Sequence, residues 1–158
     1  MKTIEASGGQ QIIVDDDDFD SLEKFNWRII GKGYAARNVA PENPSEGRIV
    51  AYMHREILGL QKGDSRVVDH VNGNPLDNRR CNLRVCTTSQ NGMNRGPAAH
   101  NKSGFKGVFW DRRRSKWTAY IRVDGRQKYL GLFATPEMAH QAYSAAALEF
   151  HGAFARTE

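Results

Sequence analysis

The sequence has only two cysteines and lacks any long apolar run. Cys81 and Cys86 cannot make a disulfide framework, and no CxxC pair is present to build a zinc knuckle. No stretch approaches the roughly 20 apolar residues of a membrane helix, and the chain shows no signal-peptide pattern. These absences predict a cytoplasmic protein with reduced thiols, and 158 residues suffice for one domain or two to three small modules.

Acidic residues become scarce toward the C-terminal part. The net charge is −3 over residues 1–60, +3 over residues 61–100 and +5 over residues 101–158. The last, most basic part also holds several aromatic residues, among them Trp110, Trp117, Tyr120 and Tyr129. Basic and aromatic side chains together indicate a surface that binds nucleic acid, although an ordinary solvated basic face is the alternative.

The first 60 residues have the pattern of a small α+β region. Residues 11–14 read as a strand, and the acidic run Asp15 to Asp18 reads as a solvated helix start, because consecutive carboxylates diverge too much to share a metal ion. We expect a hairpin around Gly31-Lys32-Gly33, then a loop that contains Pro41, Pro44, Ser45 and Gly47. A strand over residues 49–52 and a short helix through His54, Arg55 and Leu58 complete the region.

Residues 67–95 contain the most informative pattern. Residues 67–70 form a strand ending on Asp69 and His70, a turn follows over residues 72–75, and residues 83–86 form a second strand. Thr87 and Gln90 have capping-box spacing, so a short helix carrying Asn91 and Asn94 should begin there. The pattern predicts strand, loop, strand and helix within 30 residues.

This arrangement suits metal-assisted cleavage of a phosphodiester. Histidine, with an ordinary pKa of about 6.5, is the natural general base near neutral pH. A hard divalent cation needs oxygen ligands such as those of Asp69 and Asn91. If the helix folds back on the first strand, Asn91 faces Asp69 while His70 points toward the attacking water.

These residues closely resemble the HNH family of ββα-metal nucleases, in its phage and homing-endonuclease branch. The match runs through Asp69-His70, Asn72-Gly73-Asn74, Leu76 to Arg79, Asn82 to Val85 and Ser89 to Asn91. The resemblance implies that His70 is the general base, Asp69 and Asn91 are metal ligands, and Asn82 orients the loop. Asparagine at the last position favours Mg²⁺ or Mn²⁺ over zinc-like ions.

Neighbouring residues have weaker assignments. Arg55, Arg79, Arg80 and Arg84 are candidate phosphate contacts, and Asn94 is a candidate second ligand from the helix. The alternatives are that the helix around His54 only packs on the core and that His70 is a turn histidine among turn-forming asparagines.

The C-terminal part has the pattern of a sheet covered by one helix. After a linker over residues 96–104, we expect strands over residues 105–110, 116–123 and 126–133. Asp124-Gly125 predicts a two-residue type I′ turn. That turn places Arg122 opposite Gln127, Tyr120 opposite Tyr129, Thr118 opposite Gly131 and Lys116 opposite Phe133 on one face. On the other face it pairs Ala119 with Leu130 and Trp117 with Leu132, beneath a helix from Pro136 to His151.

This part resembles the APETALA-two/ethylene-response-factor type of DNA-binding domain, in the form that phage HNH nucleases carry. The match includes Phe105 to Val108, Lys116-Trp117, Ile121-Arg122, Tyr129 to Phe133 and Ala139 through Ala146. The resemblance implies DNA contacts from the sheet, and the candidates are Lys106, Arg112, Arg114, Tyr120, Arg122, Gln127 and Tyr129.

We therefore expect an α+β protein with an N-terminal region (1–60), an HNH core (61–95), a linker (96–104) and a sheet-plus-helix DNA-binding domain (105–158). Its expected function is metal-dependent, homing-type cleavage of double-stranded DNA, by a monomer in the cytoplasm of a phage-infected bacterium. A DNA-binding protein with a degenerate HNH core is the alternative. An RNA-binding or structural role ranks third, because no RNA-binding fingerprint is present.

Overall fold

A computed structural model describes residues 1–41, 45 and 47–157. Contacts divide the chain into two compact units, Met1–Thr88 and Ser89–Glu158. Pro44 of the expected loop and Glu158 lie outside the described residues. Within the described part, no helix is long and apolar enough to cross a membrane.

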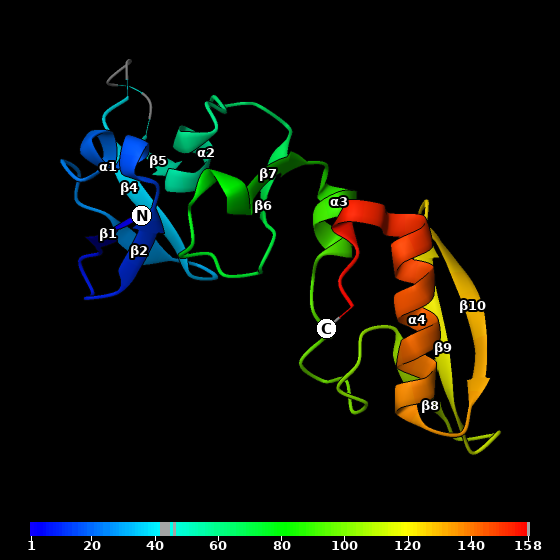
Figure 1. Cartoon of the computed structure of the whole chain (residues 1–158). Coiled ribbons are helices and arrows are strands. Elements are labelled where there is room, and N and C mark those ends of the chain that lie inside the picture. Colours follow the sequence, from blue (N-terminus) through cyan, green and yellow to red (C-terminus); the bar gives the residue numbers. More distant parts are fainter. Residues whose placement is uncertain (42–44, 46, 158) are drawn as a thin grey trace. The chain divides into compact units, whose positions relative to one another are not determined.

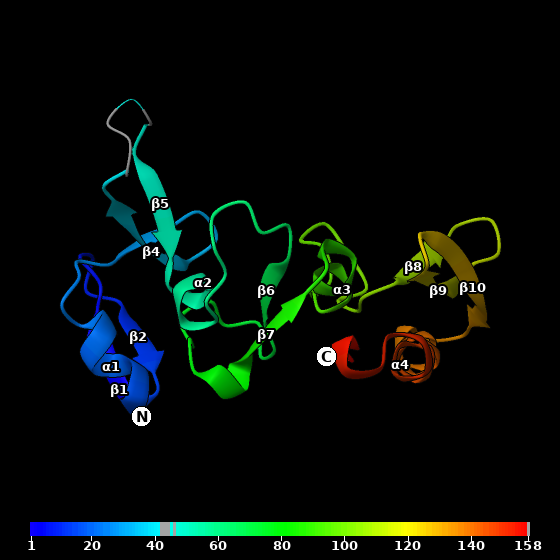
Figure 2. The same ribbon diagram turned by 90° about the horizontal axis from the view of Figure 1, so that it is seen from above.

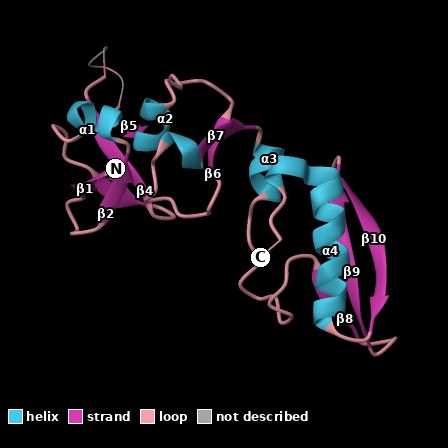
Figure 3. Cartoon of the chain, in the orientation of Figure 1, coloured by secondary structure: helices cyan, strands magenta, loops and turns pink. Residues whose placement is uncertain are grey.

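The first unit combines small antiparallel sheets with short helices (Figures 1 and 3). The strands are β1 (Lys2–Glu5) paired with β2 (Gln11–Val14), then β3 (Arg28–Ile30), β4 (Tyr34–Val39) and β5 (Ile49–Tyr52) in one sheet, and β6 (Val67–His70) paired with β7 (Leu83–Cys86). The helices are α1 (Asp16–Leu22), α2 (Met53–Ile57) and the 3-10 turn η1 (Arg80–Asn82). The expected hairpin around residues 31–33 is confirmed, while β1 was not predicted.

One apolar core connects the N-terminal strands with the β6–β7 hairpin. It includes Trp27, Met53, Val68 and Leu83, all of them buried. The loop before η1 also pairs with β2, since Ile13 donates its backbone N–H to Leu76 and accepts one from Asn78, both at 2.8 Å. The N-terminal strands therefore support the loop that joins β6 to β7.

The second unit contains a three-stranded antiparallel sheet with one long helix across one face (Figures 1 and 2). Its elements are α3 (Thr88–Met93, of which Thr88 belongs to the first unit), β8 (Val108–Asp111), β9 (Lys116–Val123), β10 (Arg126–Phe133), α4 (Pro136–His151) and the 3-10 turn η2 (Gly152–Phe154), with strand order β10-β9-β8. The expected α+β class and the C-terminal sheet-plus-helix arrangement are confirmed.

Local signals placed α4 and the β9–β10 hairpin correctly. Thr135 Oγ1 accepts the backbone N–H of Met138 at 3.3 Å, so it caps the helix as expected. Asp124 and Gly125 both have positive φ, 49° and 77°, as a type I′ turn requires. The start of the first strand was wrong, because residues 105–107 form a turn that ends on Gly107 at φ 73°.

The register beyond Tyr129 also differs from the expected one. A β-bulge at Leu130 places Gly131 opposite Ala119, Leu132 opposite Thr118 and Phe133 opposite Trp117. Gly131 adopts φ 138°, which permits the extra residue. The bulge moves Phe133 from the open face, where the simple register put it, to the face that packs on α4.

Small residues let α4 approach the sheet closely. Ala139 packs against Val108 and Ala119, while Tyr143 and Ala147 pack against Ile121. These residues are buried, and the opposite face of the sheet is left uncovered by α4. The small side chains of the alanines therefore allow α4 to lie close to the sheet.

Candidate nuclease site and nucleic-acid interface

His70 ends β6 and is buried, with its backbone paired to Leu83 of β7. Burial lowers the pKa of its imidazole, against smaller raising effects from a hydrogen bond with Asn78 and from the charges of Asp69 and Asp77. Desolvation disfavours the charged form of histidine. His70 therefore stays neutral near pH 7, which is the form a general base needs.

A second histidine lies beside His70. The ring of His54, on α2, meets that of His70 edge to face, with centroids 5.3 Å apart and planes at 87°. Tyr34 and Tyr52 complete this aromatic cluster, at 5.3 Å and 5.5 Å from His54. Burial above all, then the charges of His70 and Arg55, lowers the pKa of His54 to about 3. The sequence placed His54 on the expected helix, but no local signal predicted its contact with His70.

Asp69 is held by its partner across the hairpin. Arg84, opposite Asp69 in the register, donates to Asp69 Oδ2 from Nη2 at 2.6 Å and from Nε at 2.8 Å. Both side chains are largely buried: Asp69 is 5% exposed and Arg84 is 19% exposed. The carboxylate therefore has a cationic partner within the first unit.

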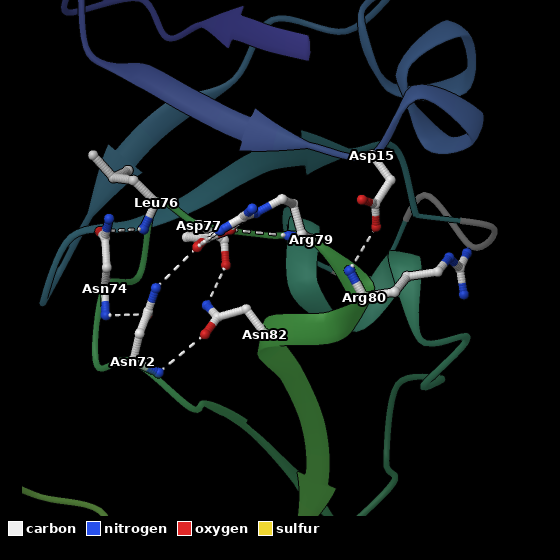
Figure 4. A network of polar contacts seen from close by, with 8 residues as sticks. All are labelled: Asp15, Asn72, Asn74, Leu76, Asp77, Arg79, Arg80 and Asn82. Carbon is white, nitrogen blue, oxygen red and sulfur yellow. Dashed lines mark hydrogen bonds and ion pairs between the residues drawn. The ribbon is translucent and has the colours of Figure 1, made fainter. Parts of the chain in front are cut away.

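A polar network shapes the loop between β6 and η1 (Figure 4). Asn82 accepts the backbone N–H of Asn72 at 3.0 Å and donates to the carbonyl of Asp77 at 2.7 Å. The Asp77 carboxylate accepts from Asn72 Nδ2 at 2.9 Å and from Arg79 at 2.6 and 2.7 Å. Asn82 thus ties both ends of the loop through hydrogen bonds, which is the geometry expected for it, while its part in catalysis stays a prediction.

The acidic run anchors η1 from the N-terminal side. α1 begins at Asp16, as expected, yet Asp18 is buried instead of solvated. Its carboxylate accepts from Arg80 Nε at 2.8 Å and Nη2 at 2.7 Å. Figure 4 shows the neighbouring contact, in which Asp15 accepts the backbone N–H of Arg80 at 2.7 Å. These partners are more than 60 residues apart in sequence, so no local pattern could have predicted them.

Each candidate phosphate-contacting arginine already donates to the protein. Arg79, Arg80 and Arg84 pair with Asp77, Asp18 and Asp69. Arg55 donates to the backbone carbonyls of Gln61, Asp64 and Arg66 and so organises the loop after α2. Their contacts with DNA stay a prediction.

The candidate metal ligands are hard oxygen donors. Asp69 supplies a carboxylate from β6, and Asn91 supplies an amide oxygen from α3, in the second unit. The described residues contain no cluster of three or more His, Cys, Asp or Glu that could form a closed metal cage. Two oxygen donors fit an ion such as Mg²⁺, which keeps several waters. The distance between Asp69 and Asn91 stays a prediction.

α3 itself begins directly after Thr87, as the capping pattern predicted. It ends at Met93, one residue before Asn94. The buried Asn94 therefore follows the helix instead of lying on it.

The uncovered face of the C-terminal sheet carries most of the expected DNA-binding residues. Arg122 lies opposite Gln127, and Tyr120 lies opposite Tyr129 with ring centroids 5.4 Å apart. Tyr129 is 51% exposed. Phe109, 48% exposed on β8, was not among the candidates and joins this face, because it pairs with Thr118, two residues before Tyr120 on β9.

The remaining candidates lie outside this strand pairing. Arg112 and Arg114 occupy the exposed turn before β9, and Arg114 pairs with Asp111 at 3.2 Å. Lys106 points its ammonium at the end of α3, where Nζ donates to the carbonyls of Gly92, at 3.3 Å, and Met93. Burial, then the charges of Arg156 and Arg95, lowers the pKa of Lys106 to about 8.

Two family models match the chain. Residues 51–93 match the HNH endonuclease family, and residues 103–153 match the AP2 domain. The first match covers the β6–β7 hairpin, its loop and α3, and the second covers the sheet with α4. The chain belongs to the HNH endonuclease family and carries an AP2 domain, so both parts imply DNA as the partner.

Individual relatives match most or part of the chain. An uncharacterized HNH endonuclease, L560, of Acanthamoeba polyphaga mimivirus is 31% identical over 143 residues, which cover 87% of this chain and 72% of the relative. Protein 3.8 of Escherichia phage T7 is 33% identical over 89 residues, 56% of this chain and 73% of that protein. APETALA2-like protein 2 of Oryza sativa is 41% identical over 58 residues, which cover 37% of this chain but only 13% of the plant protein. No solved structure matches the chain.

Proposed function

We propose that this protein is a metal-dependent endonuclease that hydrolyses a phosphodiester bond of double-stranded DNA at a site located by its AP2 domain. The observation that carries the proposal is His70, kept neutral by burial at the end of β6, beside Asp69 and next to a loop tied by Asn82. An imidazole in this form can accept a proton from water.

In the proposed reaction, His70 takes a proton from a water molecule as the water oxygen forms a bond with phosphorus. The bond from phosphorus to the 3′ oxygen breaks, and the leaving oxygen takes a proton from solvent. The products carry a 5′-phosphate and a 3′-hydroxyl. His54 supports the His70 ring from one edge, and Asn82 keeps the loop beside it in place.

Asp69 and Asn91 would hold the divalent ion, Mg²⁺ or Mn²⁺. When bound, such an ion offsets negative charge on the scissile phosphate and on the leaving oxygen. When no ion is bound, Arg84 balances the negative charge of the buried Asp69 carboxylate. The homing role, the monomeric state and the cytoplasm of an infected bacterium stay predictions from the sequence.

A second candidate function is DNA binding without cleavage. The ion pair between Asp69 and Arg84 favours it, because a carboxylate held by arginine is a poorer ligand than a solvated one. In that case the protein would only bind DNA, and the AP2 domain alone would do so.

Incubation with supercoiled plasmid separates the two functions. We expect relaxed or linear DNA with Mg²⁺ or Mn²⁺ and intact supercoils with a chelator. Sequencing of the cut ends should reveal 5′-phosphates and locate the preferred site. Retarded but uncut plasmid with every divalent ion would establish the second function instead.

A further inference from the structure

Two basic side chains of the AP2 domain contact the end of α3. Lys106 Nζ donates to the carbonyls of Gly92 and Met93, the last two residues of α3. Arg156, after η2, donates from Nη1 to the carbonyl of Asn94 at 3.4 Å. In both views the segment that follows η2 runs beside α3 (Figures 1 and 2). The helix is therefore attached at its C-terminal end to the domain that follows it.

α3 is a short and poorly buried helix. It is only six residues long, and none of these residues is buried. Helices this short are unstable in isolation, and a glycine inside the helix weakens this one further. The last turn also contains no basic residue. Lys106 supplies the missing cation, where terminal carbonyls and the negative end of the helix dipole favour positive charge.

The position of the Lys106 side chain disfavours its charged form unless the ammonium group has hydrogen-bond acceptors. The side chain is only partly exposed, and Arg156 and Arg95 repel its charge. Burial and repulsion disfavour the charged ammonium group, and its hydrogen bonds to the α3 carbonyls offset this loss. A lysine available for phosphate contact would instead extend into solvent, as Lys102 does four residues earlier.

We propose that Lys106 is a positioning residue, which holds α3 and its candidate metal ligand Asn91 on the AP2 domain instead of contacting DNA. The role of Asn91 rests on the proposed function, whereas the attachment of α3 does not. The DNA-binding domain then has two tasks: it locates the site, and it completes the nuclease by orienting the last element of the ββα motif.

Lys106→Met tests the proposal in the full-length protein. The variant keeps most of the side-chain volume and removes every donor. We expect hydrogen exchange of the α3 amides to become about tenfold faster, since a charge-assisted hydrogen bond is removed. Affinity for a short duplex that contains the parent's cut site, measured with chelator, should stay within about twofold, since every base contact is kept. Single-turnover cleavage of saturating duplex should fall by about 10–100-fold, with the Mg²⁺ midpoint at higher concentration, as for other residues that orient metal ligands.

Lys102→Met is the matched control, because it removes the same charge from an exposed position. It should leave exchange, affinity and cleavage unchanged. Lys106→Arg should restore part of the cleavage, because a guanidinium also donates to carbonyls. Arg156→Met should act in the same direction as Lys106→Met, and it provides a second test if the lysine variant folds poorly.

Two results would overturn the proposal. In the first, Lys106→Met weakens binding while bound DNA is cut at the parental rate, which would make Lys106 a DNA contact. In the second, exchange of the α3 amides is unchanged. If the parent cuts no DNA, the proposed function fails, and exchange of α3 alone still decides whether Lys106 holds this helix.

Discussion

His70 and His54 form a pair of buried imidazoles, and both have pKa values below the ordinary histidine value of 6.5. Desolvation is the main cause for each ring. Their roles differ: His70 ends the strand that also carries Asp69, whereas His54 lies on α2 and packs against the His70 ring. The pair therefore combines a candidate base with its support.

His70→Ala should reduce cleavage by about 10²–10⁴-fold, the usual loss when a general base is removed. Affinity for DNA should change little, because His70 lies outside the AP2 domain. Plasmid cleavage and gel shifts of the same samples measure both effects. His100→Ala, at an exposed loop position, is the control. Equal cleavage by His70→Ala and the parent would contradict the assignment.

The histidine pair also predicts a pH-dependent stability. Below pH 6.5 both histidines become protonated in the unfolded chain, whereas their lowered pKa values keep them neutral for longer in the folded protein. The free energy of unfolding should therefore fall as the pH falls. His54 contributes at most about 1.4 kcal/mol per pH unit, and its contribution continues down to its folded pKa of about 3.

Urea unfolding between about pH 5 and 6.5 isolates this effect, because carboxylates with ordinary pKa values near 4 remain ionised there. His54→Phe should flatten the slope of unfolding free energy against pH, and His100→Gln should not. If His54→Phe kept the parent's slope of unfolding free energy against pH, a group other than His54 would be the cause of the pH dependence.

At the scale of elements, the close approach of α4 to the sheet depends on Gly107. Its φ of 73° belongs to the left-handed region. A Cβ atom there would lie 2.4 Å from the carbonyl oxygen of Tyr120 and 2.5 Å from the buried ring of Tyr143. Neither a backbone carbonyl nor a buried ring can move away easily.

Gly107→Ala should therefore destabilise the AP2 domain by roughly 2–5 kcal/mol, from left-handed strain and overpacking together. Gly104→Ala separates the two causes, because Gly104 has φ 76° with no atom within 4 Å of the added Cβ. It should cost only roughly 1–2 kcal/mol. Urea unfolding followed by tryptophan fluorescence measures both, and equal losses would exclude the predicted clash.

Over the whole molecule, net charge changes sign along the chain. Residues 1–60 carry a net charge of −3, and within them Asp18 pairs with Arg80 of η1 while Asp15 accepts the backbone N–H of Arg80. Residues 101–158 carry +5, and the exposed Arg122 and Gln127 lie on the uncovered face of the sheet. Asp15 and Asp18 thus help to hold η1, while Arg122 is exposed on the uncovered sheet face.

We predict that Arg122→Ala combined with Tyr129→Ala weakens specific binding by about 1–3 kcal/mol for each good base contact that the substitutions remove. The slope of log affinity against log salt should decrease by about 0.9 for each phosphate contact removed. Titrations at several salt concentrations measure both quantities. Lys24→Ala removes an exposed charge from the first unit and should change neither. Unchanged affinity of the double variant would show that another surface reads the DNA.

Elements with strong local signals were determined by the sequence itself. The strands over residues 116–123 and 126–133 and the helix over residues 136–151 were predicted with their observed bounds, because a type I′ turn and an N-cap depend on adjacent residues. The strand ending on Asp69 and His70 was equally clear. The bulge was missed, although a glycine within a strand is a known bulge signal.

Only the tertiary structure decided which side chains meet. His54 with His70, Asp18 with Arg80, and Lys106 with α3 are pairs of residues far apart in sequence. Their contacts depend on how separate elements pack, and periodicity within one element holds no information about that. The sequence therefore determined the local elements and the candidate base, while packing decided that His54 supports that base and that the AP2 domain holds α3.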